Sequence, residues 1–240
     1  SIAKSSPVEA VKEQFDLRPI ALSFGSRRIF QSIGIWPALE SHAHNTISTK
    51  RGSKSKIILP DGTQVWLNAD SRLKYDENFQ GKIREVELTG EAFFDVTRDE
   101  TRPFIIHTQT IDLKVLGTAF NVRSYEEEKN TETSLIHGSV EVTLLKSPDK
   151  TKIILKPLDK LIVANNNGSN QEKLTPKADI PVMTLKKVNF KQKDTLAVET
   201  LWTRNQLAFD NEPLEEIAGK IERWYDVNVT ITSERLKKEA

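Results

Sequence analysis

Short apolar segments with a period of two follow one another through the middle of the chain. The clearest pair is residues 56–59 and 64–68, where apolar and polar side chains alternate in the second segment. Between them stands Pro60-Asp61-Gly62, a combination typical of a tight turn between antiparallel strands. The pattern therefore predicts a β-hairpin at the start of a strand-rich region.

The same texture continues to about residue 165, and no long helical pattern interrupts it. Gly62, Gly90, Gly117 and Gly138 fall between the segments, where turns need positive φ angles. Segments rich in β-branched and aromatic residues at this spacing favour a sandwich or a coiled stack of antiparallel sheets. Further strands are predicted at residues 84–88, 91–96, 104–108, 112–116, 119–125, 133–136, 139–145, 153–155 and 161–164.

A helical pattern appears only near the C-terminus. Residues 210–213, Asp-Asn-Glu-Pro, carry the capping and proline signals of a helix start. The apolar residues that follow recur at intervals of three and four, which predicts one packed face and one wet face. The packed face is expected to contain Leu214, Ile217, Ile221 and Trp224, and the wet face Glu215, Glu216, Lys220, Glu222 and Arg223.

Two strands are predicted beside this helix, at residues 206–209 and 227–231, which makes a strand-helix-strand unit. The chain is therefore expected to be mainly β, with an antiparallel domain followed by a small α+β domain. The expected divisions are a leader or linker at 1–50, the all-β domain at 51–165, a connection at 166–200 with room for one short strand, and the small domain at 201–240.

Composition excludes several classes of function. The 35 basic and 34 acidic residues leave a formal charge of +1, so no net field favours nucleic acid or anionic lipid. The chain has no cysteine, which excludes disulfides, cysteine-based zinc sites and thiol catalysis. No apolar segment approaches the ~20 residues that a membrane-spanning helix needs.

Candidate chemistry is sparse. His42 and His44 form a close pair, and His107 and His137 stand alone in predicted strands, so no metal site is expected. Neither a nucleophile elbow nor a phosphate-binding glycine loop occurs. Carboxylate pairs such as Glu85 with Glu87, or Asp95 with Asp99, could serve a glycosidase, but alternating charges on a strand usually face water. We therefore expect no catalytic residue and no cofactor.

Aromatic residues are the better candidates for binding, because they are enriched where proteins meet. Trp66, Trp202, Trp224 and Tyr225 could each anchor a sugar or a partner protein. The helical pattern puts Trp224 on the packed face and Tyr225 in an exposed position. Trp202 is compatible with either role.

Several phrases of the sequence occur together in a known family. They are Leu59-Pro60-Asp61-Gly62-Thr63 with VWLNA at residues 65–69, REVELTGE at 84–91 with AFF at 92–94, Pro103-Phe104, VLGTAFNV at 115–122, and Gly138-Ser139-Val140. Over about residues 50–165 the chain resembles the FecR family of anti-sigma factors. Residues 201–231 resemble the C-terminal domain of the Bacteroidetes branch, which is similar to the short N-terminal module of secretins and TonB-dependent receptors.

This resemblance implies a signalling protein and not an enzyme. The chain would be the periplasmic region of a single-pass inner-membrane protein, lacking the membrane helix and the cytoplasmic sigma-binding segment expected upstream. Its expected partners are the signalling domain of a TonB-dependent outer-membrane transporter and, through the cytoplasmic segment, an extracytoplasmic-function sigma factor. The small domain carries one strand-helix-strand repeat where a complete module has two, so it is expected to be truncated or completed by another chain.

Docking of that partner is expected at the small domain, where an unpaired strand edge can accept another strand. The candidate partner-binding residues are Glu216, Lys220, Tyr225, Val227 and Val229. Two alternative functions come from other classes: a carbohydrate-binding or carbohydrate-cleaving β-domain, and a structural module of the cell envelope. Neither alternative accounts for the ordered FecR phrases.

Overall fold

A computed structural model describes residues 29, 32–34, 44–77, 79, 81–165, 183–188, 197–209 and 212–237. The chain divides into two compact units, Ser1–Asn45 and Thr46–Ala240. In the first unit the described residues include a single turn, in which the Ile33 N–H and the Ser32 hydroxyl donate to the carbonyl of Ile29. His42, the first residue of the close histidine pair, lies outside the described residues.

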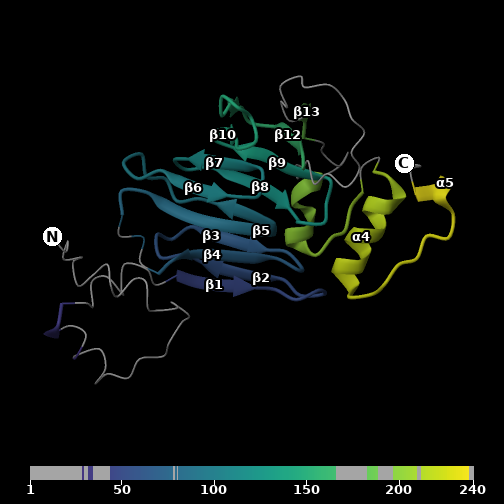
Figure 1. The fold of residues 1–240 in the computed structure, drawn as a ribbon, viewed down its shortest axis with the longest axis horizontal. Coiled ribbons are helices and arrows are strands. Elements are labelled where there is room, and N and C mark those ends of the chain that lie inside the picture. The colour runs from purple at the N-terminus through teal and green to yellow at the C-terminus, as the bar shows by residue number, and fades with distance from the viewer. Residues whose placement is uncertain are drawn as a thin grey trace, which may run out of the picture. The chain divides into compact units, whose positions relative to one another are not determined.

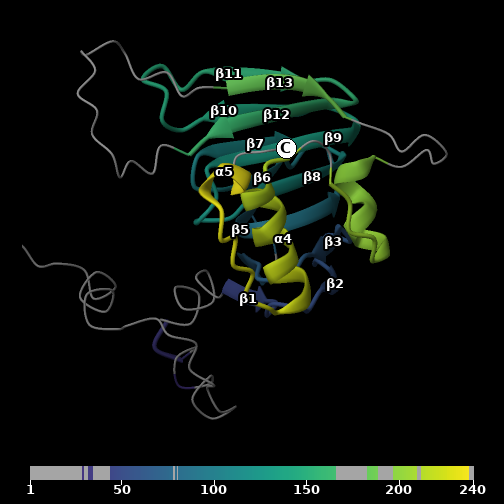
Figure 2. The ribbon, with the colours of Figure 1, turned by 90° about the vertical axis from the view of Figure 1, so that its right-hand side faces the viewer.

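Within the described residues, thirteen strands form one curled, mainly antiparallel sheet, which we call the β-domain (Figure 1). The strand order is β11-β10-β7-β6-β5-β8-β9-β12-β13, and β1 to β4 join it through β5. Figure 2 shows the strands following one another from β11 and β13 at one end to β1 and β2 at the other. The bounds are β1 His44–Ser48, β2 Ser55–Ile58, β3 Gln64–Leu67, β4 Arg72–Asp76, β5 Arg84–Asp95, β6 Phe104–His107, β7 Ile111–Val115, β8 Ala119–Ser124, β9 Asn130–His137, β10 Val140–Leu144, β11 Lys152–Leu155, β12 Asp159–Ala164 and β13 Met183–Lys187.

The long strand β5 belongs to both layers of the sheet. Its first half pairs with β4 and with β6, the latter in parallel, and its second half pairs with β3 and β8. Gly90 stands at the change of partners with φ 102°. A side chain there would collide with Ser71, because a Cβ would lie 2.7 Å from the Ser71 Cα. Only glycine therefore lets the strand pass from one layer to the other at this point.

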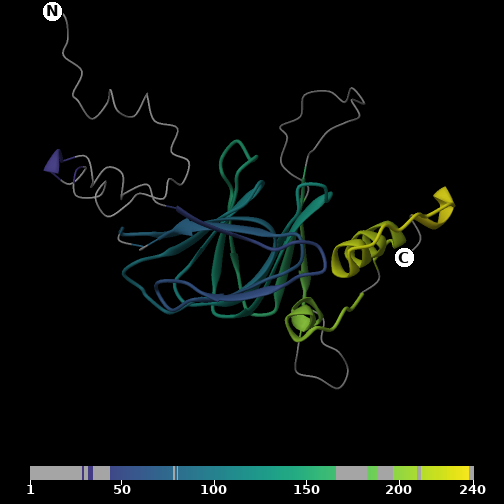
Figure 3. The ribbon, with the colours of Figure 1, turned by 90° about the horizontal axis from the view of Figure 1, so that it is seen from below.

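Alternation along the strands builds the core between the layers. In β10 every second residue, from Val140 to Leu144, is buried. Phe94 on β5 stacks on Phe120 on β8, with ring centroids 5.5 Å apart, and Phe104 on β6 lies 6.2 Å from Phe94. Burial of each such side chain stabilises the fold by roughly 1.5–3 kcal/mol. The layers seen from the side in Figure 3 are held together mainly by these contacts.

Most of the predicted strands are confirmed within one or two residues at their ends, and the fold is mainly β as expected. Within the β-domain one prediction was wrong: residues 84–88 and 91–96 are not two strands with a turn at Gly90 but the single strand β5. Strands β1 and β4 were not predicted. Strand β13 is the short strand for which the 166–200 segment had room.

Beyond the β-domain lie the 3-10 helix η1 (Val198–Arg204), the helix α4 (Leu214–Tyr225) and the short helix α5 (Glu234–Lys237). The predicted helix is thus confirmed, but residues 206–209 and 227–231 are not strands. Within the described residues no strand pairs with them, and an unpaired β-strand has no ladder to stabilise it. The N–H groups of Val227 and Val229 instead donate to the carbonyl and the side chain of Glu222. No helix among the described residues is long and apolar enough to cross a membrane.

Candidate functional site

Three of the sequence phrases meet at the carboxylate of Glu91, which is buried on β5. One oxygen accepts a hydrogen bond from Asn68 Nδ2 at 2.8 Å, and the other accepts one from Asn121 Nδ2 at 2.9 Å. The Asn121 Oδ1 in turn accepts from the indole Nε1 of Trp202 on η1, at 3.1 Å. The two amides satisfy the buried carboxylate, and the indole ties η1 to the β-domain.

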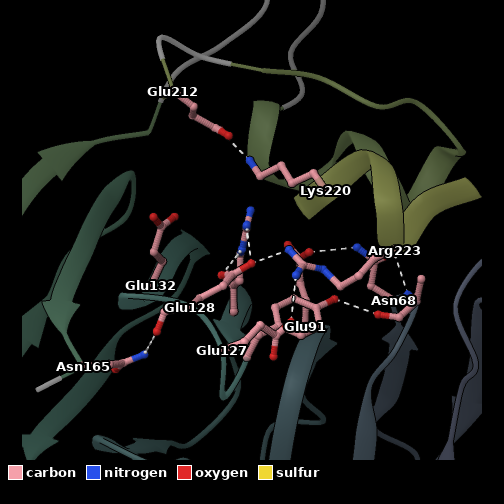
Figure 4. Close-up of polar contacts among 12 residues, drawn as sticks. Asn68, Glu91, Glu127, Glu128, Glu132, Asn165, Glu212, Lys220 and Arg223 are labelled. Carbon is pink, nitrogen blue, oxygen red and sulfur yellow. Dashed lines mark hydrogen bonds and ion pairs between the residues drawn. The ribbon is translucent and has the colours of Figure 1, made fainter. Parts of the chain in front are cut away.

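A set of ion pairs surrounds this centre (Figure 4). Arg123 on β8 binds both oxygens of Glu128, at 2.7 and 2.6 Å. Arg223 on α4 binds Glu127 at 2.9 Å and also the Glu128 carboxylate. Its guanidinium carbon lies 4.0 Å from the ring centroid of Tyr125. The guanidinium of Arg223 therefore lies between the Tyr125 ring and the carboxylates of Glu127 and Glu128, in the loop after β8.

A second group of ion pairs lies on the side of the site toward β12. Lys160 reaches Glu132 at 3.0 Å and Glu199 of η1 at 3.5 Å. Lys220 of α4 reaches Glu212 at 2.5 Å. Both lysines are thus held by carboxylates from neighbouring segments, and both side chains are largely buried.

Between these groups lies a polar cavity of about 70 Å³, lined by residues of the β-domain, η1, α4 and the segment before α4. This exceeds the roughly 10–15 Å³ that a cavity needs to hold a water molecule. One oxygen each of Glu199 and Glu212, Oε2 in both, is buried without a hydrogen-bond partner among the described residues. A buried polar atom of this kind is ordinarily satisfied by water, so we expect the cavity to be hydrated.

Burial in this cavity changes the acidity of several groups. It raises the pKa of Glu199 and lowers the pKa of Lys220, despite the opposing charges of Lys160 and Glu212. It also raises the pKa of the Tyr125 phenol, whose hydroxyl donates to the carbonyl of Ala69 at 2.8 Å. Each shift is a cost of holding charge away from water.

Helix α4 meets the β-domain with a face that the sequence pattern placed in water. Its buried residues are Ala218 and Arg223, the latter only 7% exposed. Leu214, predicted to be packed, is exposed, and Trp224 is half-buried under Lys54, whose Nζ lies 3.0 Å from the ring centroid. The prediction of the two faces was therefore wrong in part, because carboxylates of the β-domain attract the charged side of the helix.

The structure separates the five candidate partner-binding residues. Tyr225, Val227 and Val229 are exposed and close in sequence at the C-terminal end of α4, with Tyr225 62% exposed. Glu216 is half-buried on the helix, where burial raises its pKa. Lys220 points toward Glu212 and the polar cavity (Figure 4).

Sequence reasoning missed Asn68, Glu91 and Asn121 altogether. The signal that could have found them is a polar residue flanked by small or apolar residues in the FecR-like phrases. It occurs at Leu67-Asn68-Ala69, Gly90-Glu91-Ala92 and Phe120-Asn121-Val122. Such residues are unusual in strand segments that pack on both sides, and they indicate a buried polar contact.

The other candidate residues of the sequence analysis do not come together in one site within the described part of the chain. Glu85 and Glu87 are exposed on β5, as the alternation predicted, with Glu87 bound to Lys74 at 3.0 Å. His107 contacts Asp112 at 2.8 Å, within the β6–β7 hairpin. In the described part of the chain, no three histidine, aspartate or glutamate side chains are placed to hold a metal ion together. Trp66 packs edge-on against Phe93, with ring centroids 5.5 Å apart.

Comparison with known proteins assigns a family to this arrangement. The family model described as FecR protein matches residues 45–141, and the model described as FecR, C-terminal, matches residues 206–240. No curated protein matches the chain.

Two crystal structures of candidate anti-sigma factors from Parabacteroides distasonis ATCC 8503 are similar to the chain. The first, at 2.50 Å resolution, is 34% identical over 77% of this chain and 76% of that chain, with a TM-score of 0.64. The second, at 1.65 Å, is 32% identical over 82% of each chain, with a TM-score of 0.65. Since sequence, family models and fold agree over most of its length, the chain belongs to the FecR family of anti-sigma factors.

Proposed function

We propose that this chain is the periplasmic signal-relay region of a single-pass inner-membrane anti-sigma factor. In this role it binds the signalling domain of a TonB-dependent outer-membrane transporter. Binding of that domain then changes the activity of an extracytoplasmic-function sigma factor, through the cytoplasmic segment that the family resemblance implies. Membership of the FecR family supports the regulatory role, which needs protein contacts and no catalysis.

One observation supports the proposed position of the docking surface: exposed apolar and aromatic side chains lie together at the C-terminal end of α4. Tyr225, Val227 and Val229 are all exposed within five residues of chain. Tyrosine and apolar side chains that are surrounded by polar residues are typical anchors of protein interfaces. We take these three residues as the docking surface.

Hydrogen bonds hold this surface in place. Val227 N–H donates to the Glu222 carbonyl at 3.3 Å, and Val229 N–H donates to Glu222 Oε1 at 2.8 Å. Asp226 between them and the helix has φ 54°, a left-handed conformation that ends α4 and turns the chain. A surface that is ordered before binding loses less entropy when a partner docks.

The other two candidate residues have different places in the proposal. Glu216 is half-buried near the start of α4, at the opposite end of the helix from the docking surface. Lys220 is engaged by Glu212 and is only 17% exposed, so we do not include it in the proposed docking surface.

Calorimetric titration tests the proposal. The chain is titrated with the purified signalling domain of the TonB-dependent transporter encoded nearest to it, at 50 and 300 mM salt. Saturable binding with a stoichiometry of one to one supports the relay function, and its weakening in salt measures how far charge steers docking. Heat equal to that of dilution, with both proteins folded and with the signalling domains of all transporters of the organism, contradicts it.

A further inference from the structure

Helix α4 is attached to the β-domain by charge. A surface helix normally buries an apolar stripe and leaves its charged face in water. Here the buried face contains Arg223 and Ala218, while the apolar residue Leu214 is exposed. The contact is therefore unlike the core of the β-domain, where apolar side chains interlock.

Ion pairs, a backbone hydrogen bond and a cation–π contact join α4 to the β-domain within the described residues. Arg223 reaches Glu127 at 2.9 Å and also binds Glu128, and at the rim Lys129 reaches Glu215 at 2.7 Å. One backbone hydrogen bond joins the two parts, from Gly52 N–H to the Arg223 carbonyl at 2.7 Å. Lys54 completes the contact by lying over the Trp224 ring.

Closing this interface has a cost that apolar interfaces do not have. It partly buries Lys220, Glu212 and Glu199 around a polar cavity, and it leaves one oxygen of each of the two glutamates without a partner among the described residues. Removing charge from water costs several kcal/mol per ion before pairing compensates it. The stability of the closed interface is therefore a difference between two opposing terms, the cost of burying charge and the gain from ion pairing. The lowered pKa of Lys220 agrees with this cost.

We propose that α4 is a releasable element, which detaches from the β-domain and returns to it while the β-domain stays folded. Detachment separates Arg223 from Glu127 and Glu128 and opens the polar cavity to solvent. Polar interfaces inside one chain are ordinarily the ones that move. This conformational equilibrium belongs to the chain alone, so its test does not depend on the proposed transporter partner.

Release has a visible consequence. Helix α4 has twelve residues, and an isolated helix of that length is barely stable in water. When α4 detaches, its amide hydrogens therefore lose their protection and exchange with deuterium. Salt stabilises the separated charges, because the Debye length falls from about 10 Å at 0.1 M to about 3 Å at 1 M.

The chain offers a precise lock for this equilibrium. A Cβ built at Gly52 would lie 3.5 Å from the Cβ of Asp226, which is within the Cβ separation of a disulfide. The native sequence contains no cysteine, so Gly52→Cys with Asp226→Cys would introduce the only pair. Both positions have left-handed φ angles, 69° and 54°, so the reduced variant, which carries the same strain, is the reference for the oxidised one. Oxidation of this variant ties the loop after β1 to the end of α4, and reduction frees it.

Hydrogen exchange of the whole chain, followed by mass spectrometry at 20 and 500 mM salt, is the test. We expect the α4 amides of the native and the reduced double-cysteine protein to exchange on the order of tenfold faster at the higher salt, which corresponds to about 1.4 kcal/mol. The amides of β8 serve as an internal reference and should not change. In the oxidised variant the salt effect on α4 should disappear.

A second variant identifies the charge that holds the helix. Arg223→Met keeps the length of the side chain and should speed α4 exchange at 20 mM salt by at least as much as salt does in the native protein. Arg98→Met is the matched control, because Arg98 is exposed and its guanidinium pairs with the exposed Glu100 at the surface. The proposal is overturned if α4 exchange is independent of salt, if the oxidised lock leaves the salt effect intact, or if Arg223→Met exchanges like Arg98→Met.

Discussion

Arg84 and Asp61 form an ion pair inside the β-domain, with the Arg84 guanidinium 2.7 Å from Asp61 Oδ2 and the two side chains only 1% and 3% exposed. The aspartate comes from the predicted hairpin turn, and the arginine begins β5. Asp61 also binds the N–H and the hydroxyl of Thr63, at 3.0 and 2.7 Å. The phrases LPDGT and REVELTGE, which are far apart in sequence, are thus joined by one buried carboxylate.

Loss of this carboxylate charge should destabilise the fold strongly. Asp61→Asn keeps the size of the side chain and can still accept from Thr63, but it leaves Arg84 buried without a counter-charge. Breaking a buried pair in this way costs about 3–5 kcal/mol. The free energy of unfolding from urea denaturation gives the size of the effect.

Asp70→Asn is the matched control. Asp70 pairs with Arg51 at 3.4 Å, and both side chains are well exposed. Its φ of 55° suits asparagine as well as aspartate, so the loss should be below about 1 kcal/mol. Equal losses of unfolding free energy in the two variants would show that the buried Arg84–Asp61 pair contributes no more to stability than an exposed pair.

Gly90, the one glycine of β5, should be difficult to replace. Gly90→Ala puts a methyl group against the Ser71 backbone and forces a residue with a side chain to φ 102°, so a loss of more than about 1 kcal/mol is expected. Gly81→Ala is the control, since the nearest atom to its Cβ would be the Ile83 carbonyl oxygen at 3.5 Å. That variant should remain within about 1 kcal/mol of the native protein. Thermal unfolding of both variants decides the matter, and a Gly90→Ala protein as stable as Gly81→Ala would contradict the account of β5.

Lys54 makes the stability depend on pH in the alkaline range. Burial lowers its pKa from 10.5 to about 8, against the raising effect of the Glu91 charge. Between these values the unfolded chain binds more protons than the folded chain, so the contribution of Lys54 to stability rises with pH. Lys54→Met removes this contribution and keeps much of the apolar stem.

The measurement for Lys54 is the melting temperature of both proteins at intervals from pH 7.5 to 9.5. The difference between native and Lys54→Met should move in favour of the native protein as the pH rises. The range stops below the ordinary pKa of tyrosine, near 10, because the raised pKa of the buried Tyr125 phenol lowers stability above it. Parallel curves would mean that Lys54 keeps its ordinary pKa.

Much of the β-domain could be predicted from sequence because its signals are local. A period of two, with glycine or Pro-Asp-Gly at the turns, places most strands correctly, as in the hairpin of β2 and β3. Gly90 misled the prediction, because a glycine that lets a strand change layers has the same local signature as one in a turn. Glycine is required at position 90 because Ser71, which is distant in sequence, lies close to it in space.

The site could not be predicted for the same reason. Glu91 and Asn121 lie on β5 and β8, and Asn68 directly follows β3, so only the register of these three strands brings the three polar residues together. The helical period located α4 but not its orientation, because the carboxylates of Glu127 and Glu128 that attract Arg223 lie some 95 residues earlier in the chain. Alternation at residues 227–231 resembled a strand, yet Glu222 binds the N–H groups of Val227 and Val229.

The central claim is that the exposed end of α4 binds a transporter's signalling domain, and one comparison tests it most directly. Dissociation constants for that domain are measured by calorimetry with the native chain, Val227→Asp and Ile154→Asp. Ile154 is a matched apolar residue on β11, 58% exposed, and far in sequence from α4. The account predicts at least a tenfold weaker affinity, about 1.4 kcal/mol, for Val227→Asp and native affinity for Ile154→Asp. Native affinity for Val227→Asp, with the weakening found instead in Ile154→Asp, would contradict it and place the docking surface on the β-domain.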